Sequence, residues 1–296
     1  MGLFQWLWKE RQQFSNETSK HKLVKQGDRS YIEDAPYLLP KDEQEIDRLD
    51  LQHYVLRYML QRNYFAPIHN PGRILDIGCG TGRWAIEMAE SLPKTEVVGL
   101  DIIEPKVALE GRPKNVLFMQ RDVLKGIPFS SALFDYAHMR FLIAALPQNK
   151  YQDVVNAMVR VVRPGGWVEI AEPGLMRNTD TGLETLWNWL ILLGQRRGID
   201  MTASEHLPRF LENAGLTNVA LKTVTMPCGM HGGQAGEMTA RNIISLFGGL
   251  REPVIALKIA TTAQFDHMLE RTKSELANPN GSAMGPIYIA VGQRPN

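Results

Sequence analysis

The chain has 296 residues, with 33 Lys and Arg against 32 Asp and Glu and a formal net charge of +1. Hydrophobic residues make up 44% of it and charged residues 22%, which is ordinary for a globular protein. The length fits one enlarged α/β domain, or a domain with a cap. Because the charge is balanced, no broad electrostatic attraction to nucleic acid or to an anionic membrane is expected.

Cysteine and histidine usage excludes several kinds of site. Cys79 and Cys228 lie far apart, which makes neither a disulfide framework nor a metal-knuckle pattern. The seven histidines form no His-x-x-x-His or Glu-x-x-His cluster, so no metal site is expected. No apolar run reaches the roughly 18 residues needed to span a bilayer. We therefore predict a cytoplasmic protein with reduced thiols and no membrane span.

The N-terminal part is predicted to form an arm and a helical lid. Residues 1–8 are apolar but short, and we expect a helix that packs on the body or on a partner. Residues 9–30 are polar and are expected to form a loosely held surface arm. Apolar residues then recur at helical spacing over 42–61, with Asp42 as the N-cap and Glu45 as its capping-box partner.

From residue 73 onward, short apolar strands alternate with helical stretches. This alternation predicts βαβ units and right-handed crossovers, hence a Rossmann-like α/β fold whose sheet is mostly parallel. The turn Pro164-Gly165-Gly166 ends one of the helices. The predicted strands are 73–77, 96–101, 116–119, 134–138 and 167–172, and the predicted helices are 83–91 and 151–162.

After Glu172 the order of elements changes. Helices are predicted at 183–197 and 207–214, followed by a strand at 219–226 and a final strand at 287–291. The last strands complete a seven-stranded sheet with one antiparallel strand and helices on both faces. Residues 234–277 read as helical, with a break near Gly248-Gly249 and Pro253, and are expected to roof the sheet edge as a cap. The predicted division is residues 1–66 for the arm and lid, 67–175 for the cofactor-binding core, and 176–296 for the cap and the completion of the sheet.

A glycine-rich loop, Asp76-Ile77-Gly78-Cys79-Gly80-Thr81-Gly82, joins a predicted strand to a predicted helix. In an open α/β sheet the ligand crevice lies at the carboxyl ends of the strands, and glycines there let the backbone approach a ligand closely. The spacing Gly-x-Gly-x-Gly differs from the Gly-x-Gly-x-x-Gly of many dinucleotide folds, which favours a cofactor without a pyrophosphate. Asp76, just before the loop, is well placed for an ammonium group.

Acidic residues follow the next two strands. Asp101 ends the second strand, where a carboxylate can accept hydrogen bonds from both hydroxyls of a ribose, and Ile102 would pack on an adenine face. Asp122 follows the third strand and could accept from an adenine amino group, with Val123 beside the ring. The competing interpretation is that both aspartates are helix caps or turn residues.

This three-part pattern, over about residues 70–175, resembles the class I S-adenosylmethionine-dependent methyltransferases. The resemblance implies backbone contacts from Gly78 and Gly80 to the methionine part, ribose binding by Asp101 and adenine binding by Asp122. The flanks, Leu39-Pro40 through His53 and Gly292 to Pro295, resemble the narrower LaeA-like methyltransferases of secondary metabolism and regulation. The cofactor implied is S-adenosylmethionine, with S-adenosylhomocysteine as product. The predicted cofactor-binding residues are Asp76, Gly78, Cys79, Gly80, Thr81, Gly82, Asp101, Ile102, Asp122, Val123 and Met139.

Methyl transfer from a sulfonium is an in-line displacement, so its main requirement is alignment in a pocket that excludes water. Three residues at strand ends are candidate catalytic residues. His138 could be a base, or a packed histidine. Arg140 could bind a carboxylate of substrate or cofactor, or form a surface ion pair. Glu172 could bind substrate or the cofactor ammonium, or cap the next turn.

The acceptor is predicted to be a small molecule, since the cap is large and partly apolar. Trp187, Trp189 and Phe247 could line its pocket or belong to an ordinary core. The main alternative keeps the cofactor fold in a regulatory or non-methylating role, for example a cyclisation. An oxidoreductase, or a methyltransferase acting on protein or nucleic acid, is the further alternative. The acceptor atom and the oligomeric state stay open.

Overall fold

The computed structural model describes residues 4, 22–33, 36–103, 105 and 112–296. The helix expected in residues 1–8 therefore lies, apart from Phe4, outside the described residues.

The strands are β1 Leu23–Gln26, β2 Arg29–Ile32, β3 Arg73–Ile77, β4 Glu96–Asp101, β5 Val116–Gln120, β6 Phe134–Arg140, β7 Val162–Pro173, β8 Thr217–Pro227 and β9 Met284–Gln293. The helices are α2 Glu43–Leu60, α3 Arg83–Ser91, α4 Gln148–Val161, α5 Thr181–Arg196, α6 Leu207–Asn213, α7 Gly233–Ala256 and α8 Thr262–Leu276, with three short 3₁₀ turns, η1 Val123–Lys125, η2 Ala203–His206 and η3 Met230–Gly232.

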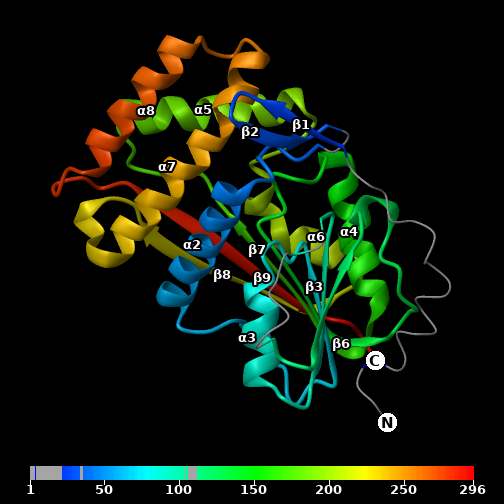
Figure 1. Cartoon of the computed structure of the whole chain (residues 1–296). Helices are drawn as coiled ribbons and strands as arrows, with labels where there is room; N and C mark the ends of the chain where they lie inside the picture. Colours follow the sequence, from blue (N-terminus) through cyan, green and yellow to red (C-terminus); the bar gives the residue numbers. More distant parts are fainter. Residues whose placement is uncertain (1–3, 5–21, 34–35, 104, 106–111) are drawn as a thin grey trace.

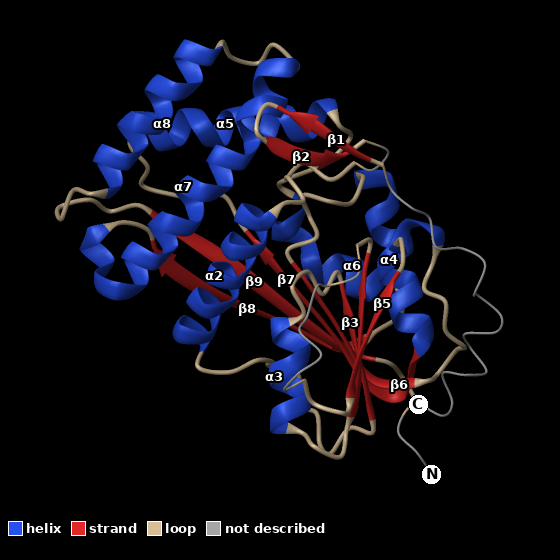
Figure 2. Cartoon of the chain, viewed as in Figure 1, coloured by secondary structure: helices blue, strands red, loops and turns tan. Residues whose placement is uncertain are grey.

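Seven strands form one twisted sheet in the order β5-β4-β3-β6-β7-β9-β8 (Figure 2). Neighbours from β5 to β7 are parallel, whereas β9 runs antiparallel to both β7 and β8. The predicted fold class is thus confirmed. From β3 the chain continues to β4 on one side and reaches β6 on the other, so the strand order reverses between β3 and β6. Ligands of open α/β sheets bind at the carboxyl ends of the strands beside such a reversal.

The two faces of the sheet are covered by different helices (Figure 1). Because side chains alternate along a strand, Leu75 and Met139 point to one face and Ile74 and Tyr136 to the other. The first pair belongs to a core with α4 and α6. The second pair packs against α3, through Trp84 and its neighbours. Along the carboxyl end of β7 and the start of β9, α2 covers the same face as α3.

The cap consists of α5, α7 and α8, which lie together beyond one end of the sheet (Figure 1). They share a separate apolar core that includes Leu186, Leu190, Phe247 and Phe265. α7 also contacts α2, so the cap and the N-terminal helix meet. In the described part of the chain, none of the helices is both long and apolar enough to cross a membrane.

The structure corrects two of the sequence predictions. Part of the expected loose arm is an antiparallel hairpin, β1 with β2, whose Tyr31 hydroxyl donates a hydrogen bond to the Gly249 carbonyl at 2.9 Å. The break expected near Gly248-Gly249 and Pro253 is also wrong, because α7 continues to Ala256. A Cβ on Gly249 would lie 3.0 Å from Pro40, so this glycine permits a close approach rather than ending the helix.

The start of α2 confirms the predicted N-cap but not the predicted capping box. Asp42 caps the helix, since its carboxylate accepts from the Glu45 amide at 3.1 Å. Glu45 does not return a bond to the cap, as a capping box would require. Its carboxylate instead accepts two hydrogen bonds from Arg48, at 2.8 and 2.6 Å.

Candidate active site

The glycine loop forms the floor of a cavity at the carboxyl ends of the strands. Gly78, Gly80 and Gly82 have φ of +66°, +56° and +79°, a region that non-glycine residues rarely adopt. A Cβ on Gly78 would lie 2.6 Å from the Leu142 side chain, so a larger residue would displace that wall. The turn is held by the Cys79 amide, which donates to the Leu100 carbonyl at 2.9 Å.

Asp76 and His138 form a buried pair at the point where the strand order reverses. They are register partners on β3 and β6, and the His138 Nδ1–H donates to Asp76 Oδ1 at 2.8 Å. The Trp84 indole stacks on the His138 ring, with centroids 3.9 Å apart and 6° between the planes. Asp76 Oδ2 is buried and has no hydrogen-bond partner among the described residues. An unpaired buried carboxylate oxygen is costly, so it suits a cationic ligand group.

Asp101 stands at the end of β4 and is held by the loop. Its carboxylate accepts from the Gly80 amide at 2.9 Å and from the Ile103 amide at 3.1 Å. Lys41 Nζ lies 3.7 Å from the carboxylate and 4.6 Å from the centroid of the Tyr37 ring. Burial disfavours the charge on Lys41, but the nearby Asp101 carboxylate outweighs it and raises the lysine pKa. The N-terminal segment is therefore anchored at this acidic residue.

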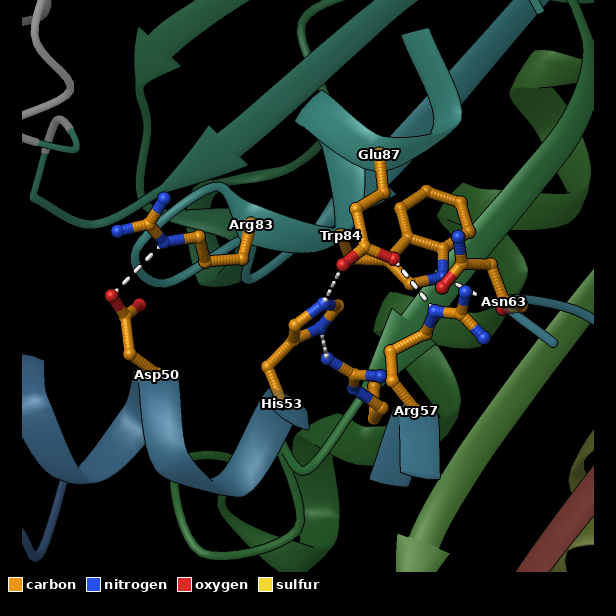
Figure 3. Close-up of polar contacts among 8 residues, drawn as sticks. Asp50, His53, Arg57, Asn63, Arg83, Trp84 and Glu87 are labelled. Atoms are coloured by element: carbon orange, nitrogen blue, oxygen red, sulfur yellow. Dashed lines mark hydrogen bonds and ion pairs between the residues drawn. The ribbon is translucent and has the colours of Figure 1, made fainter. Parts of the chain in front are cut away.

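A chain of polar contacts joins the cavity to α2 and α3 (Figure 3). Arg140 donates from Nη2 to His53 Nδ1 at 3.1 Å, and His53 Nε2 bonds to Glu87 Oε1 at 2.8 Å. Arg57 completes the chain by donating to the other oxygen of Glu87 at 2.7 Å. Since arginine has no acceptor, His53 must accept with Nδ1 and carry its proton on Nε2. Burial, followed by the charge of Arg140, lowers the pKa of His53 and favours this neutral form.

These groups surround one cavity of ≈ 1020 Å³. Asp122 lies in the cavity wall at the start of η1. It caps this 3₁₀ turn, since its carboxylate accepts a hydrogen bond from the Leu124 amide at 3.0 Å. The predicted residues that line the cavity are Asp76, Gly78, Cys79, Gly80, Thr81, Asp101, Ile102, Asp122, Val123, His138 and Arg140. Its lining also contains groups from the N-terminal segment and from α2, namely Pro36, Tyr37, Lys41, Leu49, Gln52 and His53.

Three predicted residues do not line this cavity. Met139 is fully buried in the core with α4 because it alternates with His138 and Arg140 and points to the opposite face. Glu172 also turns away, accepting from the Tyr151 hydroxyl and the Leu142 amide at 3.1 Å each. Burial raises the pKa of Glu172 to about 8, so its carboxyl is mostly neutral near pH 7. Gly82, the N-cap of α3, shapes the turn from outside the lining.

Comparison with known proteins places this geometry in a family. A model described as a methyltransferase domain matches residues 45–221. The chain is an S-adenosylmethionine-dependent methyltransferase. This methyltransferase is similar to methyltransferase str3 of Strobilurus tenacellus, with 30% identity over 201 residues that cover 65% of this chain and 71% of that protein. It is also similar to the secondary metabolism regulator LAE1 of Cochliobolus heterostrophus, with 26% identity over 88% of this chain and 90% of the relative.

One solved structure matches most of this chain at low similarity. It is phosphoethanolamine N-methyltransferase 2 of Haemonchus contortus, in complex with phosphomonomethylethanolamine and S-adenosylhomocysteine. The superposition gives a TM-score of 0.49 at 17% identity and covers 84% of this chain and 58% of that one. The family membership shown by the domain model and by str3 implies S-adenosylmethionine as the cofactor of this methyltransferase.

Sequence reasoning missed several cavity residues of the methyltransferase. His53 is not among the predicted site residues, but it hydrogen-bonds to Arg140 at the cavity wall. Trp84 is also absent from them, yet its ring lines the cavity against His138. The sequence did contain a pattern that groups the α2 residues. Leu49, Gln52 and His53 share one face of the predicted lid helix.

A second cavity of the methyltransferase, of ≈ 1040 Å³, lies between α2, the cap and the strand ends. Its wall is mainly apolar and includes Trp187, whereas Phe247 supports that ring in an edge-to-face contact at 5.5 Å. Trp189 lies elsewhere in the cap, stacked on Phe265. The two cavities share the lining residues Tyr37, Leu49, Gln52 and Phe141.

The described residues contain no group of three or more His, Cys, Asp or Glu side chains that could hold a metal ion. Both cysteines are free thiols in the structure. Burial raises the pKa of Cys79 and of Cys228, to about 12 for the second, which keeps both thiols protonated near neutral pH.

Proposed function

We propose that this methyltransferase transfers a methyl group to a small, mainly apolar acceptor in secondary metabolism. One observation carries the proposal: a cavity built on the cofactor motifs, with several charged side chains in its lining, shares a wall with a more apolar cavity of similar size. Small-molecule sites are concave, largely apolar and equipped with a few polar groups, which describes the second cavity. An acceptor held there would meet the cofactor at the shared residues.

The first cavity has groups that match each part of S-adenosylmethionine. The unpaired Asp76 Oδ2 suits the ammonium, and the half-buried Arg140 guanidinium in the cavity lining suits the carboxylate. Asp101 would accept from the ribose hydroxyls, and Asp122 with Val123 would contact the adenine. When bound, the cofactor supplies an electrophilic methyl group on a positively charged sulfur. The residues present therefore fit the group.

Alignment at the shared wall is the main contribution that the chain's own residues make. Phe141 has φ of +58°, which is unusual for a bulky residue and costs backbone energy. Its amide donates to the Ala171 carbonyl at 3.0 Å, which holds the strained residue between the cavities. A fixed aromatic wall positions the acceptor and excludes water.

The residues that both cavities share, Tyr37, Leu49, Gln52 and Phe141, include no His, Asp, Glu or Lys side chain. Both ring nitrogens of His53 are engaged, by Arg140 and Glu87. Glu172 is directed toward α4. His138 donates Nδ1–H to Asp76, and this tautomer leaves its Nε2 as the nitrogen that could accept a proton in the first cavity. The proposed transfer therefore depends mainly on alignment.

A regulatory role is the second candidate. The similarity to the regulator LAE1 extends over nearly the whole of both chains and favours it. In that case the methyl group would go to a macromolecule, or the cofactor site would serve without transfer.

Incubation with methyl-labelled S-adenosylmethionine and fractionated neutral small molecules tests the proposal. We expect label in an organic-extractable product with the wild-type chain, and much less with Asp101→Ala when the cofactor concentration is near the wild-type dissociation constant. Label that appears only in protein supports the regulatory candidate. Cofactor binding without any labelled product contradicts methyl transfer to a small molecule.

A further inference from the structure

Asn242 of α7 presents an unpaired amide to the second cavity. The residue lines that cavity and is only 8% exposed. Its Oδ1 accepts a hydrogen bond from Arg48 Nη1 at 3.0 Å. Because arginine carries donors only, the atom facing it must be the amide oxygen, so the NH₂ group is directed away from Arg48. Among the described residues, the contact with Arg48 is the hydrogen bond that this side chain makes, and its NH₂ group is left to face the cavity that the residue lines.

A buried ion pair fixes the orientation of this amide. Arg48 and Glu45 are 4% and 2% exposed, and two hydrogen bonds of 2.8 and 2.6 Å join them. Removing two charges from water is costly, so such a pair is weak evidence for a stabilising role. The pair does fix the position of Arg48. Its remaining guanidinium nitrogen, Nη1, then holds Asn242 Oδ1 across the contact between α2 and α7.

The wall holds few other polar side chains, among them Gln52 and Trp187, whose Nε1 is buried without a hydrogen-bond partner among the described residues. The Thr239 hydroxyl, one turn before Asn242, donates to the Ala235 carbonyl at 2.8 Å. Burial raises the pKa of Tyr37 to about 12, which keeps its phenol neutral. Arg48 is the charged side chain in the described lining, and Glu45 neutralises it. The cavity therefore suits a neutral molecule, and Asn242 is a lining donor whose orientation the buried Arg48–Glu45 pair fixes.

We propose that the second cavity selects a neutral, mainly apolar acceptor carrying a carbonyl or another hydrogen-bond-accepting group, which receives the Asn242 amide N–H. This inference rests on the proposed function and names the substrate class of that site. A ligand without such a group leaves a buried donor unpaired, and sites built to hydrogen-bond a ligand discriminate against the analogue that lacks the partner.

Binding of three probes of matched shape to the chain saturated with S-adenosylhomocysteine tests the inference. The probes are 2-acetylnaphthalene, 2-isopropenylnaphthalene, which replaces the carbonyl by a methylene group, and the anionic 2-naphthoate. We expect the ketone to bind about tenfold more tightly than the hydrocarbon, as one buried hydrogen bond provides. Ligand-observed NMR titration measures the affinities.

Variants on one face of α7 separate the anchor from general packing. In Asn242→Leu the preference for the ketone should disappear. In Thr239→Val, whose hydroxyl is already used within the helix, the preference should remain. Thermal melts and the affinity for S-adenosylhomocysteine report whether each variant is folded.

The inference is overturned by equal affinity for ketone and hydrocarbon, by tighter binding of the naphthoate, by a ketone preference that survives in Asn242→Leu, or by failure of all three probes to bind. The preference is measured without turnover. A chain that shows it but methylates no small molecule therefore contradicts the proposed function and supports this inference.

Discussion

Asp101 is the residue on which cofactor affinity should depend most directly. Its carboxylate accepts hydrogen bonds from the Gly80 and Ile103 amides, which fix it beside the glycine-rich loop. Hydrogen bonds to a charged group contribute about 1.5–3 kcal/mol each. We therefore expect Asp101→Ala to raise the dissociation constant for S-adenosylhomocysteine about 10- to 100-fold. Calorimetric titration measures this constant.

The matched control is Asp153→Ala. Asp153 lies on the exposed side of α4, 3.1 Å from Lys150 and away from either cavity, so its removal should leave the affinity unchanged. Both variants should keep the far-ultraviolet dichroism of the wild type. An unaltered dissociation constant in Asp101→Ala would show that this aspartate does not bind the ribose.

His53 should make stability depend on pH. Burial and then the Arg140 charge hold the pKa of His53 below its ordinary 6.5. Below pH 6.5 the unfolded chain therefore binds a proton that the folded chain does not, and the free energy of unfolding falls as the pH falls. One such group changes stability by at most about 1.4 kcal/mol per pH unit. Glu87, whose pKa is lowered from 4.5, acts only in a more acidic range.

Urea unfolding at pH 7.5 and pH 5.5 checks this expectation. Glutamine can accept from Arg140 and donate to Glu87 without titrating, so His53→Gln is the matched variant. Between the two pH values, the wild type should lose up to about 1.4 kcal/mol more than His53→Gln. Equal losses would mean that the Arg140–His53 contact does not control the titration.

Among the secondary-structure elements, those with strong local signals were predictable. The strands of the sheet and helix α3 follow from apolar runs and turn residues. The structure has β3 to β6 and α3 close to the predicted ranges, whereas β7, β8 and β9 extend beyond theirs. The β1–β2 hairpin was missed although Gly27-Asp28 between two alternating runs is a two-residue turn signal. Helix α7 passes through a Gly pair and Pro253 because packing against Pro40 and α2 outweighs their local preference.

The candidate site was predictable only where the chain itself brings residues together. The loop and the ends of β3, β4 and β6 converge because parallel strands end at one edge of a sheet. Helical spacing places His53 on one face with Leu49 and Gln52, but only tertiary contacts bring it to Glu87 of α3. Only a tertiary contact likewise brings Asn242 of α7 to Arg48 of α2. Met139 was misplaced because the strand period of two was not applied to the residues around His138.

Helix α2 and the segment before it are proposed to form a lid over the cofactor. Tyr37, Lys41 and His53 all line the first cavity, and Lys41 reaches Asp101. A bound cofactor should hold these contacts closed. Hydrogen exchange of amides in 36–60 is therefore expected to slow on addition of S-adenosylhomocysteine, more than in α8, which lines neither cavity. Unchanged exchange in 36–60 at saturating ligand would rule out a lid.

At the scale of the whole molecule, we propose that the sheet binds the cofactor and the cap binds the acceptor. The sheet ends supply fixed backbone and carboxylates, which suit a cofactor of constant structure. The cap helices supply mostly side-chain walls, whose shape can change without disturbing the strand ends. α2 belongs to both cavities and couples them through Leu49 and Gln52. This arrangement lets one fold serve different acceptors by variation of the cap.

If the division holds, filling the second cavity should block turnover while leaving cofactor binding intact. Leu246 of α7 lines only that cavity, and Leu246→Trp would occupy part of it. We expect labelled-methyl transfer to fall at least tenfold (about 1.4 kcal/mol or more), with the affinity for S-adenosylhomocysteine retained. Leu192→Trp, on an α5 position that is 37% exposed, is the control for an added indole in the cap. Full activity in Leu246→Trp would place the acceptor elsewhere, because an acceptor in this cavity cannot share its volume with the new ring.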